Sequence, residues 1–259
     1  MKKSDSYDIN SNAKETNSNE FVFRPRARIM RTLGQELISD ESVALIELVK
    51  NSFDADATRV LIRFTNPLKK GKGIIEVIDN GVGMSMNTIK NAWMEPATNS
   101  KRTRKTSEKL NRKLLGEKGI GRFACSRLAS DLELITKRES DSLENYAYFD
   151  WEQFDNEEVY LDQIEVLAEQ RLPKEICSGG SIEALDWNEE LRTNEIVNHK
   201  QGTILRMNKL IKDWSEPEFK DLQRNLSRLI SPFVQFSDFR IKLELPSEIS
   251  QYSKEISSP

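Results

Sequence analysis

Apolar and polar side chains follow two periods along this chain. Residues 42–57 carry apolar side chains at helical spacing, and Ser39 or Asp40 stands where the cap of that helix belongs. Residues 59–64 and 74–78 alternate apolar and polar side chains, and a turn rich in Pro, Lys and Gly separates them. The pattern therefore predicts a central helix followed by a β-hairpin.

The rest of the chain also carries both helical and strand patterns. Further strands are expected at 132–136, 146–148, 159–164, 202–206 and 239–245, and further helices at 21–38 (after a short strand), 123–129, 166–172 and 215–230. Residues 1–20 are polar and are expected to be disordered. We expect one domain over residues 21–245 and a polar tail at 246–259.

The central helix carries a polar face. Glu47 and Asn51 are four residues apart and therefore project from the same side, which Asp54 shares. A carboxylate beside a carboxamide oxygen suits Mg²⁺-assisted attack of water on a phosphate, because one group orients the water and the other holds the metal. A surface helix with an ordinary polar face is the alternative.

A second candidate follows the hairpin, in the stretch D-N-G-V-G-M. Asp79 ends a strand, and Gly81 and Gly83 allow the backbone to approach a ligand closely. A buried carboxylate here could accept a hydrogen bond from an exocyclic amine such as adenine N6, and Met84 offers a soft apolar surface to a flat ring. Alone, the stretch equally fits a simple turn.

A third candidate is the stretch G-E-K-G-I-G-R-F-A at residues 116–124. Gly116, Gly119 and Gly121 precede a helical pattern, so their backbone N–H groups could form a nest for an anion, with Lys118 adding charge. The stretch is neither a Walker A loop nor a dinucleotide-binding fingerprint.

Charge is unevenly distributed. Residues 101–118, the basic loop, hold eight Lys or Arg against two Glu, which fits either a solvated loop or a mobile lid over an anionic ligand. Residues 139–200, the acidic segment, hold 17 Asp or Glu against four Lys or Arg. That segment would repel DNA phosphates, although a solvated acidic face is the simpler interpretation.

Composition sets broad limits. The 259 residues suffice for one large or two small domains, and the net charge of −3 argues neither for nor against nucleic acid. Cys125 and Cys177 lack metal-like spacing, which indicates a reducing compartment. No apolar run approaches the ~20 residues of a membrane span, and no secretory signal is present, so a cytoplasmic protein is expected.

Three blocks occur in order over residues 28–210: E-L-V-K-N-S-F-D-A, D-N-G-V-G-M and G-E-K-G-I-G-R-F-A, followed by a late G-T. This order resembles the GHKL superfamily, named for gyrase, the heat-shock chaperone, histidine kinases and MutL. The first block is most similar to the MutL, type VI topoisomerase and microrchidia-like branch. The resemblance implies the Bergerat fold, a two-layer α/β sandwich whose mixed, mainly antiparallel sheet carries helices on one face.

The resemblance also implies roles for individual residues. Glu47 resembles the general base that activates water, Asn51 the Mg²⁺ ligand and Asp79 the carboxylate that reads adenine. Gly81 and Gly83 match the turn glycines, and Met84 resembles the residue beside the purine. Thr203 resembles the threonine that helps to bind adenine through water, and Asp54 resembles a residue of the same helix that supports the groups in contact with the ligand. The matches to the phosphate loop are Gly116, Lys118, Gly119 and Gly121.

The activity implied is slow, Mg²⁺-dependent ATP hydrolysis that works as a conformational switch through lid closure, homodimerisation or engagement of a protein partner. Two alternatives remain, a nucleotide sensor without hydrolysis and a kinase acting on a partner. The chain has a single histidine, His199, so a kinase carrying its own acceptor in a preceding helix is excluded. About fifty residues follow Thr203, too few for the transducer domain of gyrase and MutL relatives, so a fragment or a different coupling is expected.

Overall fold

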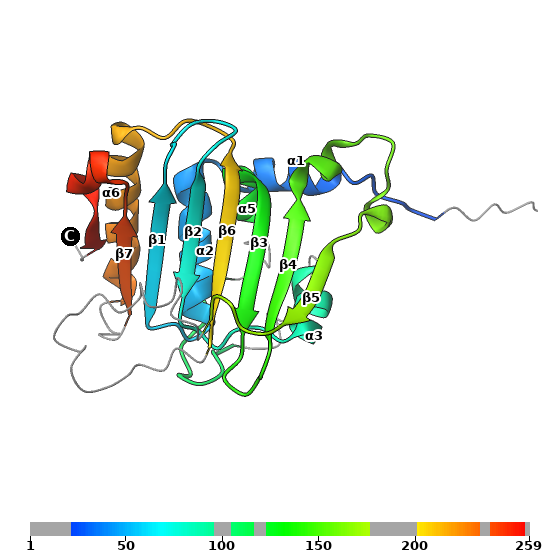
Figure 1. The fold of residues 1–259 in the computed structure, drawn as a ribbon, viewed down its shortest axis with the longest axis horizontal. Helices are drawn as coiled ribbons and strands as arrows, with labels where there is room; N and C mark the ends of the chain where they lie inside the picture. Colours follow the sequence, from blue (N-terminus) through cyan, green and yellow to red (C-terminus); the bar gives the residue numbers. More distant parts are fainter. Residues whose placement is uncertain (1–21, 96–104, 117–122, 177–200, 234–238, 257–259) are drawn as a thin grey trace, which may run out of the picture.

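The computed structural model describes residues 22–95, 105–116, 123–176, 201–233 and 239–256 (Figure 1). In this part of the chain the strands form one eight-stranded sheet in the order β5-β4-β3-β6-β2-β1-β7-β8. Within the same residues, no helix is both long and apolar enough to cross a bilayer.

The helical elements are α1 (Ile29–Leu37), α2 (Glu41–Asp54), α3 (Met86–Thr88), α5 (Ala124–Leu128) and α6 (Glu216–Phe233), with a π-helical turn η1 (Ile89–Trp93) and 3-10 turns η3 (Trp151–Asp155), η4 (Leu161–Gln163) and η7 (Ser247–Tyr252). The strands are β1 (Arg59–Thr65), β2 (Ile74–Asp79), β3 (Ala129–Lys137), β4 (Glu144–Asp150), β5 (Leu167–Arg171), β6 (Gly202–Leu210), β7 (Arg240–Glu244) and β8 (Lys254–Ile256).

Neighbouring strands of the described sheet are antiparallel, apart from the parallel pair β1 and β7. Helices α2 and α5 lie behind the sheet in Figure 1, where α1 and α6 flank them. This arrangement confirms the predicted two-layer α/β sandwich with a mixed, mainly antiparallel sheet.

Helix α2 begins where the sequence predicted. Asp40 has an extended backbone, and its carboxylate accepts a hydrogen bond from the backbone N–H of Val43 at 2.9 Å. Between the two predicted caps, Asp40 is therefore the one that caps the helix, a contact that contributes about 1 kcal/mol. The fixed start determines which side chains of α2 face the sheet.

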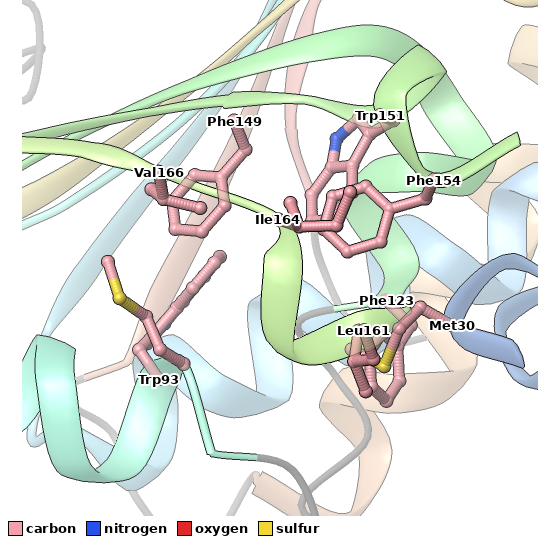
Figure 2. Close-up of a pocket in the computed structure, with 10 residues that line it drawn as sticks. Met30, Trp93, Phe123, Phe149, Trp151, Phe154, Leu161, Ile164 and Val166 are labelled. Atoms are coloured by element: carbon pink, nitrogen blue, oxygen red, sulfur yellow. The ribbon is translucent and has the colours of Figure 1, made fainter. Parts of the chain in front are cut away.

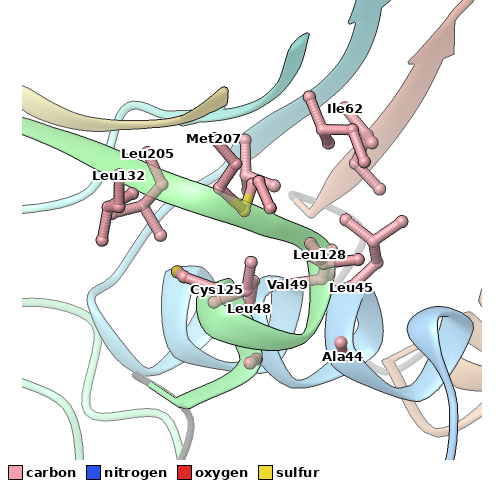
Figure 3. Close-up of a cluster of buried hydrophobic side chains, with 14 of the residues drawn as sticks. Ala44, Leu45, Leu48, Val49, Ile62, Cys125, Leu128, Leu132, Leu205 and Met207 are labelled. Atoms are coloured by element: carbon pink, nitrogen blue, oxygen red, sulfur yellow. The ribbon is translucent and has the colours of Figure 1, made fainter. Parts of the chain in front are cut away.

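The main core fills the space between the helices and the sheet. Figure 3 shows buried side chains of α2 and α5 facing those of the sheet; among them are Leu45, Leu48, Val49, Cys125, Leu128, Ile62, Leu132, Leu205 and Met207. Burying each large apolar side chain contributes about 1.5–3 kcal/mol relative to exposure. The core therefore anchors α2 firmly across the central strands, with its polar face turned away from them.

The opposite face of the sheet carries two rows of side chains that cross the strands. One row is apolar and consists of Leu61, Ile78, Ile204 and Ile135, covered by Ile176. The other row alternates in charge, in the order Glu244, Arg63, Glu76, Arg206 and Glu133, and each neighbouring pair lies within 2.9–3.5 Å. We call the second row the charge row.

Three predicted elements are wrong, two of them in the acidic segment and one before α1. The strand expected over 159–164 is replaced by the 3-10 turn η4, and the helix expected over 166–172 is the edge strand β5. Pairing with β4 supplies β5 with hydrogen bonds that its helical pattern could not anticipate. The short strand expected before α1 is reduced to one bridge between Arg26 and Tyr160.

The domain limits need one adjustment. Residues 246–259 were expected to form a polar tail, but they contain η7 and β8, and β8 pairs with β7 at the edge of the sheet. The ordered sheet therefore continues past residue 245. The segment 1–20, expected to be disordered, lies outside the described residues.

Candidate functional site

The polar face of α2 is present as predicted. Glu47, Asn51 and Asp54 are all half-exposed, whereas their neighbours Leu48 and Phe53 are buried. The ammonium of Lys50 lies 2.6 Å from Glu47 Oε1, and both side chains are 28% exposed. This ion pair restricts the orientation of the Glu47 carboxylate above the helix surface.

Asp79 lies at the end of β2 and is only 5% exposed. Its Oδ1 accepts the backbone N–H of Gly81 and its Oδ2 accepts the hydroxyl of Ser52, each at 2.9 Å. Burial raises the pKa of Asp79 to about 6, although both hydrogen bonds oppose this shift. A buried carboxylate with unused lone pairs suits an amine donor such as an adenine N6 group.

Sequence reasoning missed Ser52. Its hydroxyl joins Asp79 to α2, directly beside Asn51 in the sequence. The sequence feature that could have identified it is a small polar residue on the buried side of an amphipathic helix, because a buried hydroxyl needs a hydrogen-bond partner. Ser52 thus links the helix bearing the predicted metal ligand to the predicted adenine-reading carboxylate.

Three strands bring the other predicted adenine contacts together. Thr203 of β6 lies opposite Asp79 of β2 on one side and opposite Thr136 of β3 on the other. The hydroxyls of Thr136 and Thr203 are 3.0 Å apart, and Thr136 Oγ1 accepts the backbone N–H of Met84 at 2.9 Å. Thr136, which sequence reasoning also missed, therefore connects Met84 to Thr203.

Gly81 and Gly83 approach other parts of the chain itself. A Cβ on Gly81 would lie 2.6 Å from the carbonyl oxygen of Ala55. A Cβ on Gly83, whose φ is +67°, would lie 2.1 Å from the carbonyl oxygen of Lys137. This close packing holds the turn after β2 between the end of α2 and the end of β3, and the predicted approach of these glycines to a ligand stays a prediction.

Gly83→Ala is expected to lower the free energy of unfolding by about 3 kcal/mol, because a left-handed backbone conformation costs about 1–2 kcal/mol and forced overpacking adds a similar amount. Gly71→Ala is the matched control, since Gly71 has a similar φ of +74° and no atom within 4 Å of its would-be Cβ. The control should lose only about 1 kcal/mol. Urea unfolding measures both, and equal losses would contradict the close contact.

Asp54 holds the entry to the third glycine-rich stretch. Its Oδ1 accepts the backbone N–H of Leu115 at 2.8 Å and its Oδ2 that of Gly116 at 3.0 Å. These contacts fasten Gly116 to the C-terminal end of α2. The other predicted phosphate-loop residues, Lys118, Gly119 and Gly121, lie outside the described residues.

The described part of the basic loop is a docked hairpin. Residues 105–114 include an antiparallel bridge between Thr106 and Lys113. Arg112 is 2% exposed, donates to the carbonyl oxygen of Ala57 and stacks its guanidinium 4.6 Å from the ring of Phe53. In this part of the chain the loop is therefore packed against the protein rather than surrounded by solvent.

Asp56 anchors this hairpin. Its carboxylate accepts the backbone N–H groups of Lys109 at 2.6 Å and Leu110 at 3.2 Å. Burial raises the pKa of Asp56, but hydrogen bonds from Lys109, Ser107 and Leu110 outweigh that effect, and the pKa falls below its ordinary value. The Asp56 carboxylate is thus held in its charged form by the hairpin that it anchors.

A second set of contacts ties the hairpin to the far side of the site. The Lys109 ammonium lies 2.9 Å from Glu139 Oε2 and 3.0 Å from Gln201 Oε1. Gln201 immediately precedes the G-T stretch that contains Thr203. The hairpin therefore connects the end of α2 with the strand that carries a predicted adenine contact.

Asp56→Ala is expected to release the hairpin and to accelerate tryptic cleavage after Lys109 by about tenfold or more, because two hydrogen bonds to a charged group are lost. Mass spectrometry of the early fragments measures this rate. The control is Asp213→Ala, which removes a carboxylate that accepts a backbone N–H from Lys70 in another turn. Unchanged cleavage after Lys109 in Asp56→Ala would contradict the anchor.

The same anchor predicts a pH dependence. Because the pKa of Asp56 is lowered in the folded state, its stabilising contribution is present at neutral pH and is lost as the pH falls through that lowered pKa. The difference in protection of the hairpin between wild type and Asp56→Ala should therefore be largest at neutral pH and should shrink in acid. Cleavage assays need neutral conditions, so amide hydrogen exchange of Lys109 and Leu110 provides the readout in acid.

Comparison with known proteins identifies the family. The profile described as "Histidine kinase-, DNA gyrase B-, and HSP90-like ATPase" matches residues 38–178, more than half of the chain. The chain is 34% identical to the DNA mismatch repair protein MutL of Thermotoga maritima over 120 residues, which are 46% of this chain and 22% of that protein. It is 29% identical to the MutL of Flavobacterium johnsoniae over 126 residues, 48% of this chain and 18% of that protein.

The matched segment contains the polar face of α2, the turn after β2 and Gly116. The alignments cover only about a fifth of the two MutL proteins. The sheet order and the ordered blocks agree with the profile match, and the chain belongs to the GHKL superfamily of ATPases.

Proposed function

We propose that this chain is an ATP-binding domain that hydrolyses ATP slowly with Mg²⁺ and that the bound nucleotide works as a conformational switch. The observation that supports this most is the hydrogen bond between Ser52 and the buried carboxylate of Asp79. Ser52 is next to Asn51 in α2, so the bond supports a base site at Asp79 and a metal site at Asn51 that are joined through one contact.

Recognition of the base follows from the groups at the strand ends. Asp79 accepts a hydrogen bond from the adenine N6 amine, and Thr203 contacts the ring through water. Met84 packs on the ring face, and its backbone is held by Thr136 and by the Asn145 amide, which donates to the Met84 carbonyl oxygen at 2.8 Å. A site in which the polar groups are already positioned loses little entropy when the base binds.

Hydrolysis uses the polar face of α2. Glu47 orients the attacking water and takes its proton, while the Asn51 carboxamide oxygen is a ligand of the hard type that Mg²⁺ prefers. Mg²⁺ held there would offset the negative charge of the phosphates. Lys118, Gly119 and Gly121 contact the phosphates, and Asp54 positions the start of their loop through Gly116.

The switch follows from the contacts of the hairpin at 105–114. It is attached both to Asp56, which follows the Asp54 that binds Gly116, and to Gln201, which precedes the proposed adenine contact Thr203. A bound nucleotide that contacts both of these regions therefore shifts the position of the hairpin. The shifted hairpin changes a surface that binds a second copy of the chain or a protein partner.

The test is to measure ATP binding by calorimetry and phosphate release in parallel, with Mg²⁺ and with EDTA. Binding together with Mg²⁺-dependent release supports the proposal. Binding without release indicates a nucleotide sensor, and transfer of the γ-phosphate to a partner protein indicates a kinase. Absence of ATP binding would overturn the proposed function.

A further inference from the structure

Five polar side chains form one row across the side of the sheet that faces α2. Side chains that stand opposite each other on neighbouring strands project from the same face. By this pairing the row crosses β2, β6, β3, β4 and the edge strand β5, and its members are Asp79, Thr203, Thr136, Asn145 and Gln170. We call it the polar row. Apolar residues occupy the next positions of the same face, for example Leu205 on β6 and Leu134 on β3, and Phe149 farther along β4 lines an apolar pocket (Figure 2).

The proposed function uses the members of the polar row on β2, β6 and β3. The row continues across two further strands, through the fully buried Asn145 on β4 to the exposed Gln170 on β5. A buried carboxamide lowers stability unless its donor and its acceptor both find partners. The partners of Asn145 therefore indicate why a polar side chain is kept at this position.

Both ends of the Asn145 carboxamide are bonded. Its Nδ2 donates to the carbonyl oxygen of Met84 at 2.8 Å, and its Oδ1 accepts from Gln170 Nε2 at 3.0 Å. A carboxamide has one donor end and one acceptor end. Because a carbonyl oxygen faces the donor end, the acceptor end needs a hydrogen-bond donor, and Gln170 supplies it.

We propose that Asn145 and Gln170 are positioning residues that hold Met84 for recognition of the base. Gln170 fixes the direction of the Asn145 amide, and Asn145 then holds the carbonyl oxygen of Met84, whose N–H is held by Thr136. This inference rests on the proposed function, which packs Met84 on the adenine ring. The edge strand β5 thus acts on the base site, although β4 lies between it and β3.

Gln170→Glu is the main test, because at neutral pH the new carboxylate accepts hydrogen bonds but donates none. The Asn145 amide then meets an acceptor on each side and turns its donor end to the carboxylate, since bonds to charged groups are the stronger ones. Its oxygen comes to face the Met84 carbonyl oxygen, and Met84 is released. Calorimetry should show ATP affinity about tenfold weaker, while kcat stays within about twofold because Glu47 is untouched.

Two further variants separate the hydrogen bond from side-chain size and from charge. Gln170→Ala should weaken ATP binding by no more than about threefold, because water can donate to Asn145 at this exposed position. Ala168→Glu places the same charge on the same face of β5, opposite Ala147 instead of Asn145, and should bind ATP within about twofold of wild type. Equal losses in Gln170→Glu and Ala168→Glu, or no loss in Gln170→Glu, would overturn the positioning role.

Amide hydrogen exchange without nucleotide tests the contact separately from the ATPase. Gln170→Glu should accelerate exchange of the Met84 N–H by about tenfold, because the peptide loses its hold on the carbonyl side, and Ala168→Glu should leave it unchanged. Unchanged exchange in Gln170→Glu would overturn the inference even if the chain bound ATP. If wild type bound no ATP, the proposed function would fail, and the exchange rates would still decide whether Gln170 positions Met84.

Discussion

Replacing Asp79 by Asn is expected to weaken ATP binding by about a hundredfold, because a hydrogen bond from the adenine amine to a charged acceptor is lost and an amide N–H faces that amine instead. Calorimetric titration with ATP measures the loss. GTP presents a carbonyl oxygen in place of the amine, so its binding should fall less. An unchanged affinity for ATP would remove Asp79 from the base-recognition site.

The same variant should be more stable than wild type above pH 7. The pKa of Asp79 is raised to about 6 in the folded state, so the folded protein binds more protons than the unfolded chain between about pH 4 and pH 6. Wild-type stability therefore falls as the pH rises through this window, by up to about 3 kcal/mol, and stays low above it.

The Asp79→Asn substitution would remove that pH dependence while keeping the local hydrogen bonds satisfied. The new amide oxygen can accept from Gly81, and the amide nitrogen can donate to Ser52, whose hydroxyl is also 3.3 Å from the carbonyl oxygen of Leu48. Urea unfolding at pH 4.5 and pH 8 measures the effect. Asp79→Ala is the control, because it leaves the Gly81 N–H without this acceptor and should be less stable than Asp79→Asn at both pH values.

Glu47→Ala is expected to lower ATP turnover by about a hundredfold or more while ATP affinity stays within a few-fold of wild type, because a positioned general base contributes to the rate rather than to ground-state binding. The matched control is Lys50→Ala. Both variants break the same ion pair of 2.6 Å, but only Glu47→Ala removes the carboxylate.

Turnover in Lys50→Ala should therefore remain within about tenfold of wild type, a smaller loss than that of the base itself. Steady-state phosphate release and calorimetric ATP binding, measured on both variants, separate rate from affinity. Turnover that survives in Glu47→Ala would assign the base elsewhere.

Elements with a strong local pattern were predictable from the sequence. The period of α2, its polar cap and the hairpin of β1 and β2 each depend on residues near one another in the chain, and the structure has all three. The start of α6 has a local contact of the same kind, since the backbone N–H of Ser215 donates to Glu218, three residues later, at 3.0 Å. These elements could be predicted because they depend on local chemistry rather than on distant partners.

Features that depend on distant partners were not predictable. The segment that became β5 has no clear strand alternation, and only its pairing with β4 decides its conformation. Thr136 resembles any polar residue at a strand end until β3 lies beside β6 and brings its hydroxyl within 3.0 Å of Thr203. Both outcomes depend on residues more than fifteen positions away.

The basic loop is a further example of a structure that depends on distant residues and could not be predicted from the sequence. Its charge predicted either a solvated loop or a mobile lid, and neither description anticipates a buried arginine. Arg112 is accommodated because Ala57 supplies an acceptor and Phe53 an aromatic face, and both lie more than fifty residues earlier in the chain. A count of charges cannot distinguish an arginine that binds phosphate from one that fastens a hairpin.

The charge row described on the outer face of the sheet bears on how the strands assemble. In the native pairing Arg63 lies opposite Glu76, and Arg206 lies opposite Glu76 and Glu133. A slip of two residues between β1 and β2 would keep each side chain on its face but would set Arg63 against Ile74 or Ile78. An arginine without its carboxylate would then be trapped among apolar groups, so misaligned pairings are penalised during folding, as are pairings with strands borrowed from another molecule.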